Sequence, residues 1–179
     1  MKILILKIGE VEDEVLRAIC KGVEKTLPNT KCVIKVSVAP LPPEAFNRER
    51  GQYEASYILS WITLHRKEYA ADRILGVTEA DLYAKDLNFI FGQAQFSGKT
   101  CLISTHRLRP EFYGLRNNRE LFTIRCIKEA VHELGHTFGL YHCRNPLCVM
   151  YFSNSIYDTD LKRAEFCERC KETITNILQ

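Results

Sequence analysis

The sequence lacks the long hydrophobic run of a membrane protein, since no apolar stretch approaches the roughly 20 residues of a spanning helix. It also lacks an export signal, because the apolar run at residues 3–6 is interrupted by Lys7 and no small-residue cleavage site follows. Charge of one sign is not in excess: the formal net charge is +3, which is too small to indicate nucleic-acid binding. We therefore expect a cytoplasmic protein that binds neither nucleic acid nor membrane.

Internal repeats, low-complexity segments and linkers are also missing from the chain. With 46% hydrophobic and 26% charged residues among 179, the composition is that of an ordinary globular protein, which excludes disordered and collagen-like classes. A chain of this length buries enough surface to fold without disulfides. We expect a monomer with one domain over residues 1–179, divided into an N-terminal lobe (1–139) and a C-terminal lobe (140–179).

Strand-like and helix-like segments alternate through the first half of the sequence. The expected strands are 2–8, 31–38 and 73–78, and the expected helices are 11–27 and 53–70. This β-α-β-α-β order is typical of a mostly parallel sheet covered by helices. Residues 88–95 and 100–105 predict two further strands whose link is too short for a parallel crossover, so we expect one of them to run antiparallel. Such an edge strand can bind an extended peptide, although sequence alone favours an ordinary hairpin with a covered edge.

The second half of the sequence predicts one long helix over residues 119–138. Asn118 is placed to be its N-cap, and Gly139 is placed to end it. Residues 106–118 before this helix are loop-like. After residue 140 there is little periodicity until a final helix, which we expect over 160–178.

The strongest chemical signal is the segment His-Glu-Leu-Gly-His at residues 132–136. On a helix, side chains four residues apart lie on the same face, so His132 and His136 can bind one zinc ion. Glu133 lies beside them, where a carboxylate can orient and deprotonate a zinc-activated water.

Gly139 and His142 follow this segment at intervals of three residues. After two ligands on a helix, the chain must turn sharply to supply a third, and Gly139 can take the positive φ that such a turn demands. Three nitrogen ligands leave one coordination position open for water or substrate, which is typical of a catalytic zinc site.

The eight cysteines fall into two groups. Two close pairs, with four and two residues between their members, match a closed structural zinc site: Cys143, Cys148, Cys167 and Cys170. Buried free thiols and redox chemistry are the other interpretations of this group. The remaining four lack ligand-like spacing, and we expect them to be core thiols: Cys20, Cys32, Cys101 and Cys126.

Met150 lies eight residues after His142. A methionine here, after a three-histidine helix, is similar to the methionine turn beneath the metal in metzincins. The histidine motif, the two cysteine pairs and Met150 together resemble the archaemetzincin family, and residues 88–94 are similar to that family's edge-strand segment. The resemblance does not extend to the tyrosine ligand of astacin-like relatives, because Phe152 stands two places after Met150.

This resemblance implies an α/β (α+β) fold of the metzincin type: a mixed sheet with an antiparallel edge strand, a backing helix, an active-site helix and a small cysteine-rich C-terminal lobe. It implies two zinc ions per chain and Glu133 as general base, with Gly139 and Met150 in supporting positions. The catalytic zinc would bind His132, His136 and His142. The structural zinc would bind Cys143, Cys148, Cys167 and Cys170.

We interpret the chain as a zinc-dependent peptidase, a hydrolase that acts on peptides or unfolded proteins. The alternative is a zinc-stabilised module that binds peptides or proteins with little or no turnover, because the motif predicts metal geometry better than catalysis. Nothing in the sequence supplies an acidic anchor for a free amino terminus, so aminopeptidase and endopeptidase activity both stay open.

Other polar residues receive structural interpretations. His65 and His106 are expected not to touch substrate. The basic residues before the long helix either form a solvated face or favour acidic peptides: Lys99, Arg107, Arg109, Arg116 and Arg119. Nucleic-acid binding through the four-cysteine module is disfavoured, because the segment between the two pairs is acidic.

Overall fold

The computed structural model describes residues 1–178, apart from the side chains of Val36, Ser37 and Leu178. A five-stranded sheet forms its centre, in the order β2-β1-β5-β8-β7. Its strands are β1 (Lys2–Ile8), β2 (Lys31–Ala39), β5 (Arg73–Thr78), β7 (Gly92–Ala94) and β8 (Thr100–Ser104). Neighbours are parallel from β2 to β8, while β7 pairs antiparallel with β8 at the edge. The predicted mixed sheet with an antiparallel edge strand is therefore confirmed.

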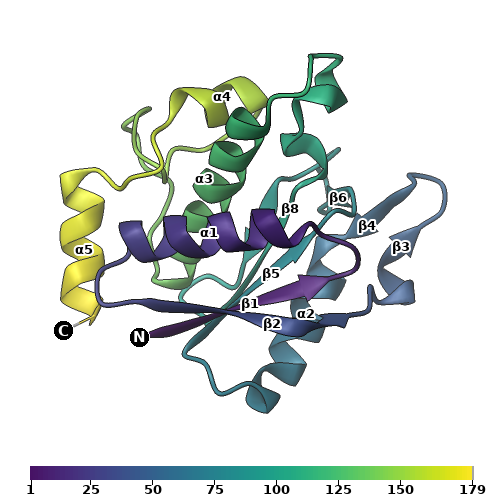
Figure 1. The fold of residues 1–179 in the computed structure, drawn as a ribbon. Coiled ribbons are helices and arrows are strands. Elements are labelled where there is room, and N and C mark those ends of the chain that lie inside the picture. Colours follow the sequence, from purple (N-terminus) through teal and green to yellow (C-terminus); the bar gives the residue numbers. More distant parts are fainter. Residues whose placement is uncertain (179) are drawn as a thin grey trace.

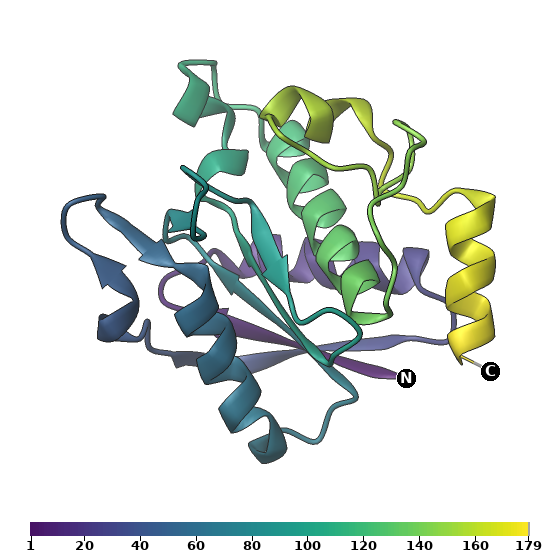
Figure 2. The ribbon, with the colours of Figure 1, turned by 180° about the vertical axis from the view of Figure 1, so that it is seen from behind.

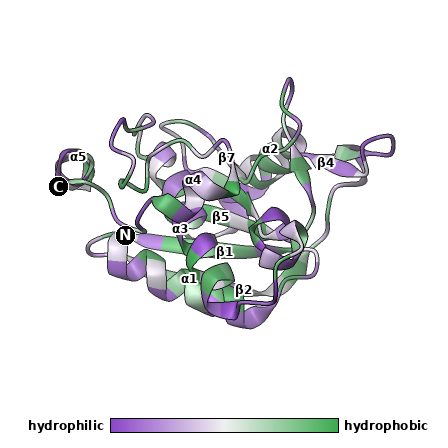
Figure 3. Ribbon diagram, turned by 90° about the horizontal axis from the view of Figure 1, so that it is seen from above, coloured by the Kyte–Doolittle hydropathy of each residue, from purple (hydrophilic) through white to green (hydrophobic). Residues whose placement is uncertain are grey.

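Helices cover both faces of this sheet (Figure 1). Helices α1 (Asp13–Thr26) and α3 (Arg119–Thr137) lie on one face, and α2 (Ala55–His65) lies on the other. The core is correspondingly split in two: Leu16 of α1 and Leu134 of α3 belong to one cluster, and Ile58 of α2 to the other. In Figure 3, green hydrophobic residues predominate in the strands between these helix layers.

A second, three-stranded sheet lies beside the first and was not predicted from the sequence. It has the order β3-β4-β6, with β3 (Phe46–Asn47), β4 (Gln52–Glu54) and β6 (Leu82–Tyr83). The helix predicted over 53–70 is accordingly shorter, because its first two residues belong to β4. The described residues also contain four short 3₁₀ helices in the connecting segments: Pro43–Ala45, Arg66–Glu68, His106–Leu108 and Pro110–Tyr113.

The strand predicted over 88–95 is also too long. Only Gly92–Ala94 pairs as β7, whereas residues 84–91 form an irregular segment that precedes it along the sheet edge. Figure 2 shows β7 on the side of the sheet where α3 lies. The space between this edge and α3 is where the chemistry-bearing residues gather.

The single helix predicted over 160–178 is wrong. The chain instead forms α4 (Ile156–Leu161), an irregular link, and α5 (Glu168–Leu178). The interruption has a physical cause, since it buries Lys162 against α3 and brings Cys167 next to Cys143. No helix within residues 1–178 is long and apolar enough to cross a membrane.

Candidate functional site

Three histidines meet beneath the sheet edge. His132 and His136 stand one turn apart on α3, and His142 comes from the loop that follows this helix. One ring nitrogen from each histidine lies within 4.8 Å of the others. Gly139 allows the chain to turn back toward the two helical histidines after α3. Its φ is +82°, a left-handed conformation that a residue with a Cβ rarely adopts.

The two helical histidines are oriented as metal ligands should be. Nδ1 of His132 lies 2.7 Å from the carbonyl oxygen of Val149, and Nδ1 of His136 lies 2.7 Å from that of Leu140. Because a carbonyl can only accept, each Nδ1 must carry its proton, which leaves a lone pair on Nε2. The two Nε2 atoms face each other at 3.1 Å. Two lone pairs aimed at one point repel unless a cation lies between them, so the donor set fits a metal ion.

Glu133 lies beside the histidines and against the sheet edge. Its Cγ and Oε1 would be 2.6 and 2.8 Å from a Cβ placed on Gly92, so only glycine leaves room for this side chain. Burial raises the pKa of the Glu133 carboxyl well above its usual range, and the Glu129 carboxylate adds to the rise while Lys162 opposes it. A carboxyl group in this position is confined against the sheet edge and lines the same cleft as the three histidines.

A buried ion pair lies behind the histidines. Lys162 Nζ is 2.9 Å from Glu129 Oε1, and the two side chains are 0% and 3% exposed. The same Nζ is 3.5 Å from His132 Nδ1. Thr159 donates a further hydrogen bond to Glu129, so α4 and the link after it are fastened to α3 directly behind the first histidine. Sequence reasoning missed this pair, because neither residue belongs to a recognisable motif.

Met150 and Phe152 complete the surroundings of the histidines. Met150 is fully buried, and its sulfur occupies the space that a Cβ on Gly135 would need. The Phe152 ring lies 4.9 Å from the His142 ring and is half exposed. The methionine therefore supports α3 at the turn that carries His132 and His136, and Phe152 flanks the third histidine.

The four C-terminal cysteines form a second cluster. One sulfur from each lies within 4.8 Å of the others, and Cys143 Sγ is 3.8 Å from Cys167 Sγ. A tetrahedral zinc with Zn–S bonds of about 2.3 Å separates its sulfurs by about 3.8 Å, so this spacing fits zinc, whereas a disulfide would need a much shorter one. All eight cysteines within the described residues are free thiols.

Cys143 has the character of a ligand rather than of an inert core thiol. Burial acts to raise its pKa, but the Asn145 N–H, the neighbouring thiols and Arg169 outweigh it and lower the pKa to about 7. Cys143 follows His142 directly, so a single peptide bond joins the two clusters.

A cleft of about 470 Å³ opens between the sheet edge and α3. One wall consists of residues 84–94, the floor contains the three histidines with Glu129 and Glu133, and the far wall contains residues 152–154. Phe91 O and Gln95 N bond to β8, so by the alternation of an antiparallel pair Gly92 and Ala94 turn their backbone N–H and C=O toward the cleft. Asp86 adds a carboxylate to the wall that the sequence analysis did not single out.

The remaining candidates lie away from this cleft. His65 bonds to the Trp61 carbonyl, and His106 packs edge-on against Phe112. Cys101 and Cys126 are fully buried core thiols, Cys32 is buried, and Cys20 is half-buried. Three of the five basic residues before or at the start of α3 are held in ion pairs instead of forming a free basic face: Arg107, Arg109 and Arg119.

Comparison with known proteins adds independent information. A family model described as peptidase family M54 matches residues 6–176. An archaemetzincin from Methanocaldococcus jannaschii is 45% identical over 170 residues, covering 95% of this chain and 90% of that protein. The crystal structure of an archaemetzincin from Methanopyrus kandleri has a TM-score of 0.87 and 38% identity, covering 99% of this chain and 95% of that one. A zinc-dependent peptidase from Methanocorpusculum labreanum has a TM-score of 0.87 and 29% identity, with coverage of 97% and 100%.

Proposed function

The chain belongs to peptidase family M54, the archaemetzincins, and we propose that its three-histidine cleft hydrolyses peptide bonds with Glu133 as the general base. Membership of this family makes it a zinc metallopeptidase that acts on peptides. The observation that carries the proposal is the arrangement of Glu133 beside converging histidine nitrogens at the floor of a cleft with a free strand edge.

The catalytic zinc would be held by His132, His136 and His142. When bound there, zinc supplies a Lewis acid that polarises a carbonyl group and lowers the pKa of a water molecule. The carbonyl oxygens of Val149 and Leu140 hold two of the imidazole rings in the required tautomer.

Glu133 would accept a proton from the attacking water and pass it to the nitrogen of the leaving amine. Its confinement between α3 and Gly92 supports this role, because a general base has to stay within hydrogen-bond reach of the proton that it takes. Burial of the carboxylate also keeps bulk water from competing for it.

The substrate main chain would add to the free edge of β7. Gly92 and Ala94 direct backbone donors and acceptors into the cleft, and an extended peptide can satisfy them as a further strand. Binding through the main chain fixes the position of a peptide bond with little demand on its side chains.

A second zinc would be held by Cys143, Cys148, Cys167 and Cys170, which makes two ions per chain. Four thiolates leave no open position, so this ion would have a structural role. It would fasten α5 and the irregular C-terminal segment to the loop that carries His142.

The decisive experiment incubates the zinc-loaded protein with a mixed-sequence peptide library and identifies the products by mass spectrometry. A Glu133→Ala variant, confirmed to hold its metal, is treated in parallel. We expect cleavage by the wild type alone, and the cut positions distinguish trimming from the ends from internal cleavage. Turnover by a zinc-loaded Glu133→Ala sample would contradict the role of the glutamate.

A zinc-stabilised module that binds peptides without turnover is the second candidate function. The half-exposed Phe152 and the free strand edge suit peptide binding whether or not cleavage follows. Absence of cleavage by the metal-loaded wild type, together with binding of the library peptides, would favour this candidate.

A further inference from the structure

The wall of the cleft contains a segment that has almost no regular structure of its own. Residues 84–91, here called the cleft wall, connect β6 to β7 and line the cleft along most of their length. Their backbone is held at the C-terminal end, where the Ile90 N–H donates to the Leu82 carbonyl and the Phe91 carbonyl accepts from the Ser104 N–H. The carbonyls in the middle have no strand to pair with.

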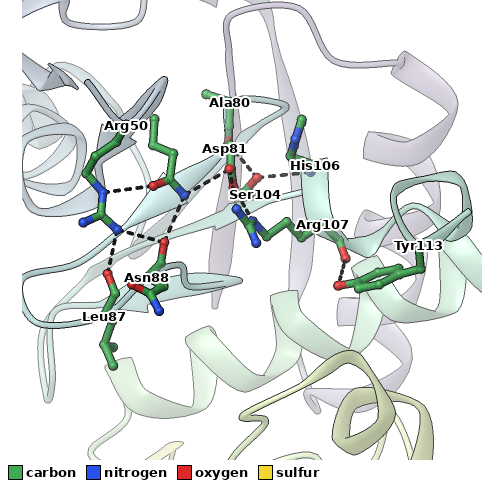
Figure 4. Close-up of polar contacts among 10 residues, drawn as sticks. Arg50, Ala80, Asp81, Leu87, Asn88, Ser104, His106, Arg107 and Tyr113 are labelled. Atoms are coloured by element: carbon green, nitrogen blue, oxygen red, sulfur yellow. Dashed lines mark hydrogen bonds and ion pairs between the residues drawn. The ribbon is translucent and has the colours of Figure 1, made fainter. Parts of the chain in front are cut away.

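Side chains from the small sheet hold these carbonyls instead (Figure 4). Arg50 Nη2 donates to Leu87 O at 3.1 Å and to Asn88 O at 3.0 Å. Gln52, which is buried, donates from Nε2 to Asn88 O at 3.1 Å. Arg50 is itself oriented by a bond to Gln52 and by stacking on the Tyr83 ring, with its guanidinium carbon 4.3 Å from the ring centroid.

A second arginine holds the same segment through an aromatic ring. The Arg107 guanidinium contacts the rings of both Phe89 and Phe112, at 4.6 and 4.8 Å from their centroids. Asp81 fixes its plane by accepting from Nε at 2.6 Å and from Nη2 at 2.8 Å. Phe89 is part of the cleft wall, so the position of this ring depends on a planar cation behind it.

Asp81 joins the two attachments into one network. Its Oδ2 accepts both from Gln52 at 3.0 Å and from Arg107 at 2.8 Å. Figure 4 shows the two arginines on either side of this aspartate, with Leu87 and Asn88 below Arg50. The cleft wall is therefore positioned from outside the cleft, by groups that touch neither the histidines nor Glu133.

We propose that Arg50 and Arg107 are positioning residues for substrate binding, which set the place of the cleft wall and thereby the peptides that the cleft accepts. The inference rests on the proposed peptidase function. Because both arginines act on the wall and not on the metal-binding floor, their loss changes the affinity for peptide while zinc binding stays intact.

The chain offers a matched control for Arg107. Arg109 lies in the same loop, is exposed to a similar degree (27% against 22% for the side chains), pairs with Glu12 and Glu79, and stacks on Phe122 at 4.5 Å. It makes no contact with the cleft wall in the described structure. Replacement by lysine keeps the charge but removes the two-pronged bond and the planar stacking.

We expect Arg107→Lys to raise KM for library peptides roughly tenfold, since a misplaced binding surface of about 1 Å costs up to about 10²-fold. The value of kcat and the zinc content should stay near those of the wild type, which is the signature of lost ground-state binding. The set of cut positions should shift as well. Arg109→Lys should keep the wild-type KM and cut positions.

A second pair of variants tests the inference independently, in case Arg107→Lys does not fold. Arg50 and Arg48 are both exposed arginines of the β3–β4 turn, but only Arg50 bonds to the cleft wall among the described residues. Arg50→Ala should raise KM in the same direction as Arg107→Lys, and Arg48→Ala should leave it unchanged. Equal KM values and cut positions for the wild type, Arg107→Lys and Arg50→Ala would overturn the inference, as would parallel losses of kcat and zinc.

A binding measurement separates this inference from the proposed catalysis. Each variant is combined with Glu133→Ala, loaded with zinc, and titrated against fluorescein-labelled β-casein by fluorescence anisotropy. Weaker binding by the Arg107→Lys and Arg50→Ala combinations supports the inference even if the wild type cleaves nothing. Equal binding by all combinations overturns it, whatever the wild type cleaves.

Discussion

At the scale of single residues, Gly92 determines where Glu133 can lie. A Cβ at position 92 would meet the glutamate at 2.6 Å and the Leu102 carbonyl at 2.8 Å, and the backbone oxygen cannot move aside. We expect Gly92→Ala to displace the carboxylate and to lower kcat by about 10²-fold, the cost of misplacing a catalytic group by about 1 Å. Steady-state kinetics on a library peptide measures this effect, with zinc content determined in the same sample.

Gly98→Ala is the control for this substitution, because the three atoms nearest to a Cβ there all belong to the flexible side chain of Gln95. It lies in the same hairpin and should keep its kcat. If Gly92→Ala also retains wild-type kcat, the position of Glu133 does not depend on Gly92.

The buried pair of Glu129 and Lys162 leads to a second prediction at this scale. In Glu129→Gln the ammonium of Lys162 would stay buried near His132 without its counter-charge, which disfavours a metal cation nearby. We expect zinc affinity at the histidine site to fall by about 10–100-fold, as for other partners of metal ligands. Competition with a chromogenic chelator measures the affinity without any need for activity.

Asp160→Asn provides the comparison for Glu129→Gln. Asp160 accepts two hydrogen bonds of 2.7 Å from Arg125 and so fastens the same two segments, α3 and α4, at a distance from the histidines. Its loss should lower the melting temperature and leave zinc affinity at the histidines unchanged. Equal zinc affinities for both variants would mean that the Glu129–Lys162 pair acts only on stability.

At the scale of helices and strands, the local pattern of apolar residues correctly predicted the elements that pack against other regular helices and strands. Periodic apolar residues gave β1, β5, α1 and α3 nearly at their observed ends. The cap at Asn118 is confirmed as well, because its side chain accepts from Leu121 N at 3.0 Å. The spacing of the histidine motif could be recognised for the same reason, because two of its histidines lie on one face of a helix.

The elements that sequence analysis missed are held by distant side chains. Residues 88–91 of the cleft wall were predicted to belong to a strand because they are mostly apolar. The carbonyls of Leu87 and Asn88 instead bond to Arg50 and Gln52, which lie 36 to 38 positions earlier in the chain. The break between α4 and α5 depends on Lys162 meeting Glu129, which periodicity cannot reveal. The Glu129–Lys162 pair itself was not predicted, because its two residues are far apart in the sequence.

The C-terminal segment supports a prediction at the scale of elements. Between α3 and α5 only α4 is regular among the described residues, so the four cysteines and the zinc that we propose they bind would replace the hydrogen bonds that a sheet would supply. We expect Cys167→Ser to lower both the melting temperature and the zinc content of the protein. Cys20→Ser, at a half-buried thiol outside the cluster, should change neither. An unchanged melting temperature and zinc content for Cys167→Ser would contradict a structural four-cysteine site.

At the scale of the whole molecule, the cleft is assembled from three parts of the chain that are far apart in sequence. Residues 84–94 supply the upper wall, α3 supplies the floor, and residues 142–154 supply the third histidine and the far wall. Residues 84–94 and α3 are held together through the central sheet. The position of residues 142–154 depends instead on the turn at Gly139, on the hydrogen bond that the Cys143 N–H donates to the Met150 carbonyl, and on the cysteine cluster. We therefore expect metal binding at the two clusters to be linked to global stability.

This linkage predicts how metal removal affects the folded protein. A ligand present at about a thousand times its Kd stabilises the native state by about 4.1 kcal/mol, and each kcal/mol shifts the melting temperature of a domain of this size by about 2–4 °C. We therefore expect EDTA to lower the melting temperature by at least about 8–16 °C. The shift should persist in Glu133→Ala, which retains all seven proposed ligands, and should be smaller in Cys167→Ser, which starts without the structural ion. Differential scanning calorimetry with and without EDTA tests this, and equal melting temperatures for zinc-loaded and chelated wild type would show that neither cluster contributes metal-dependent stability.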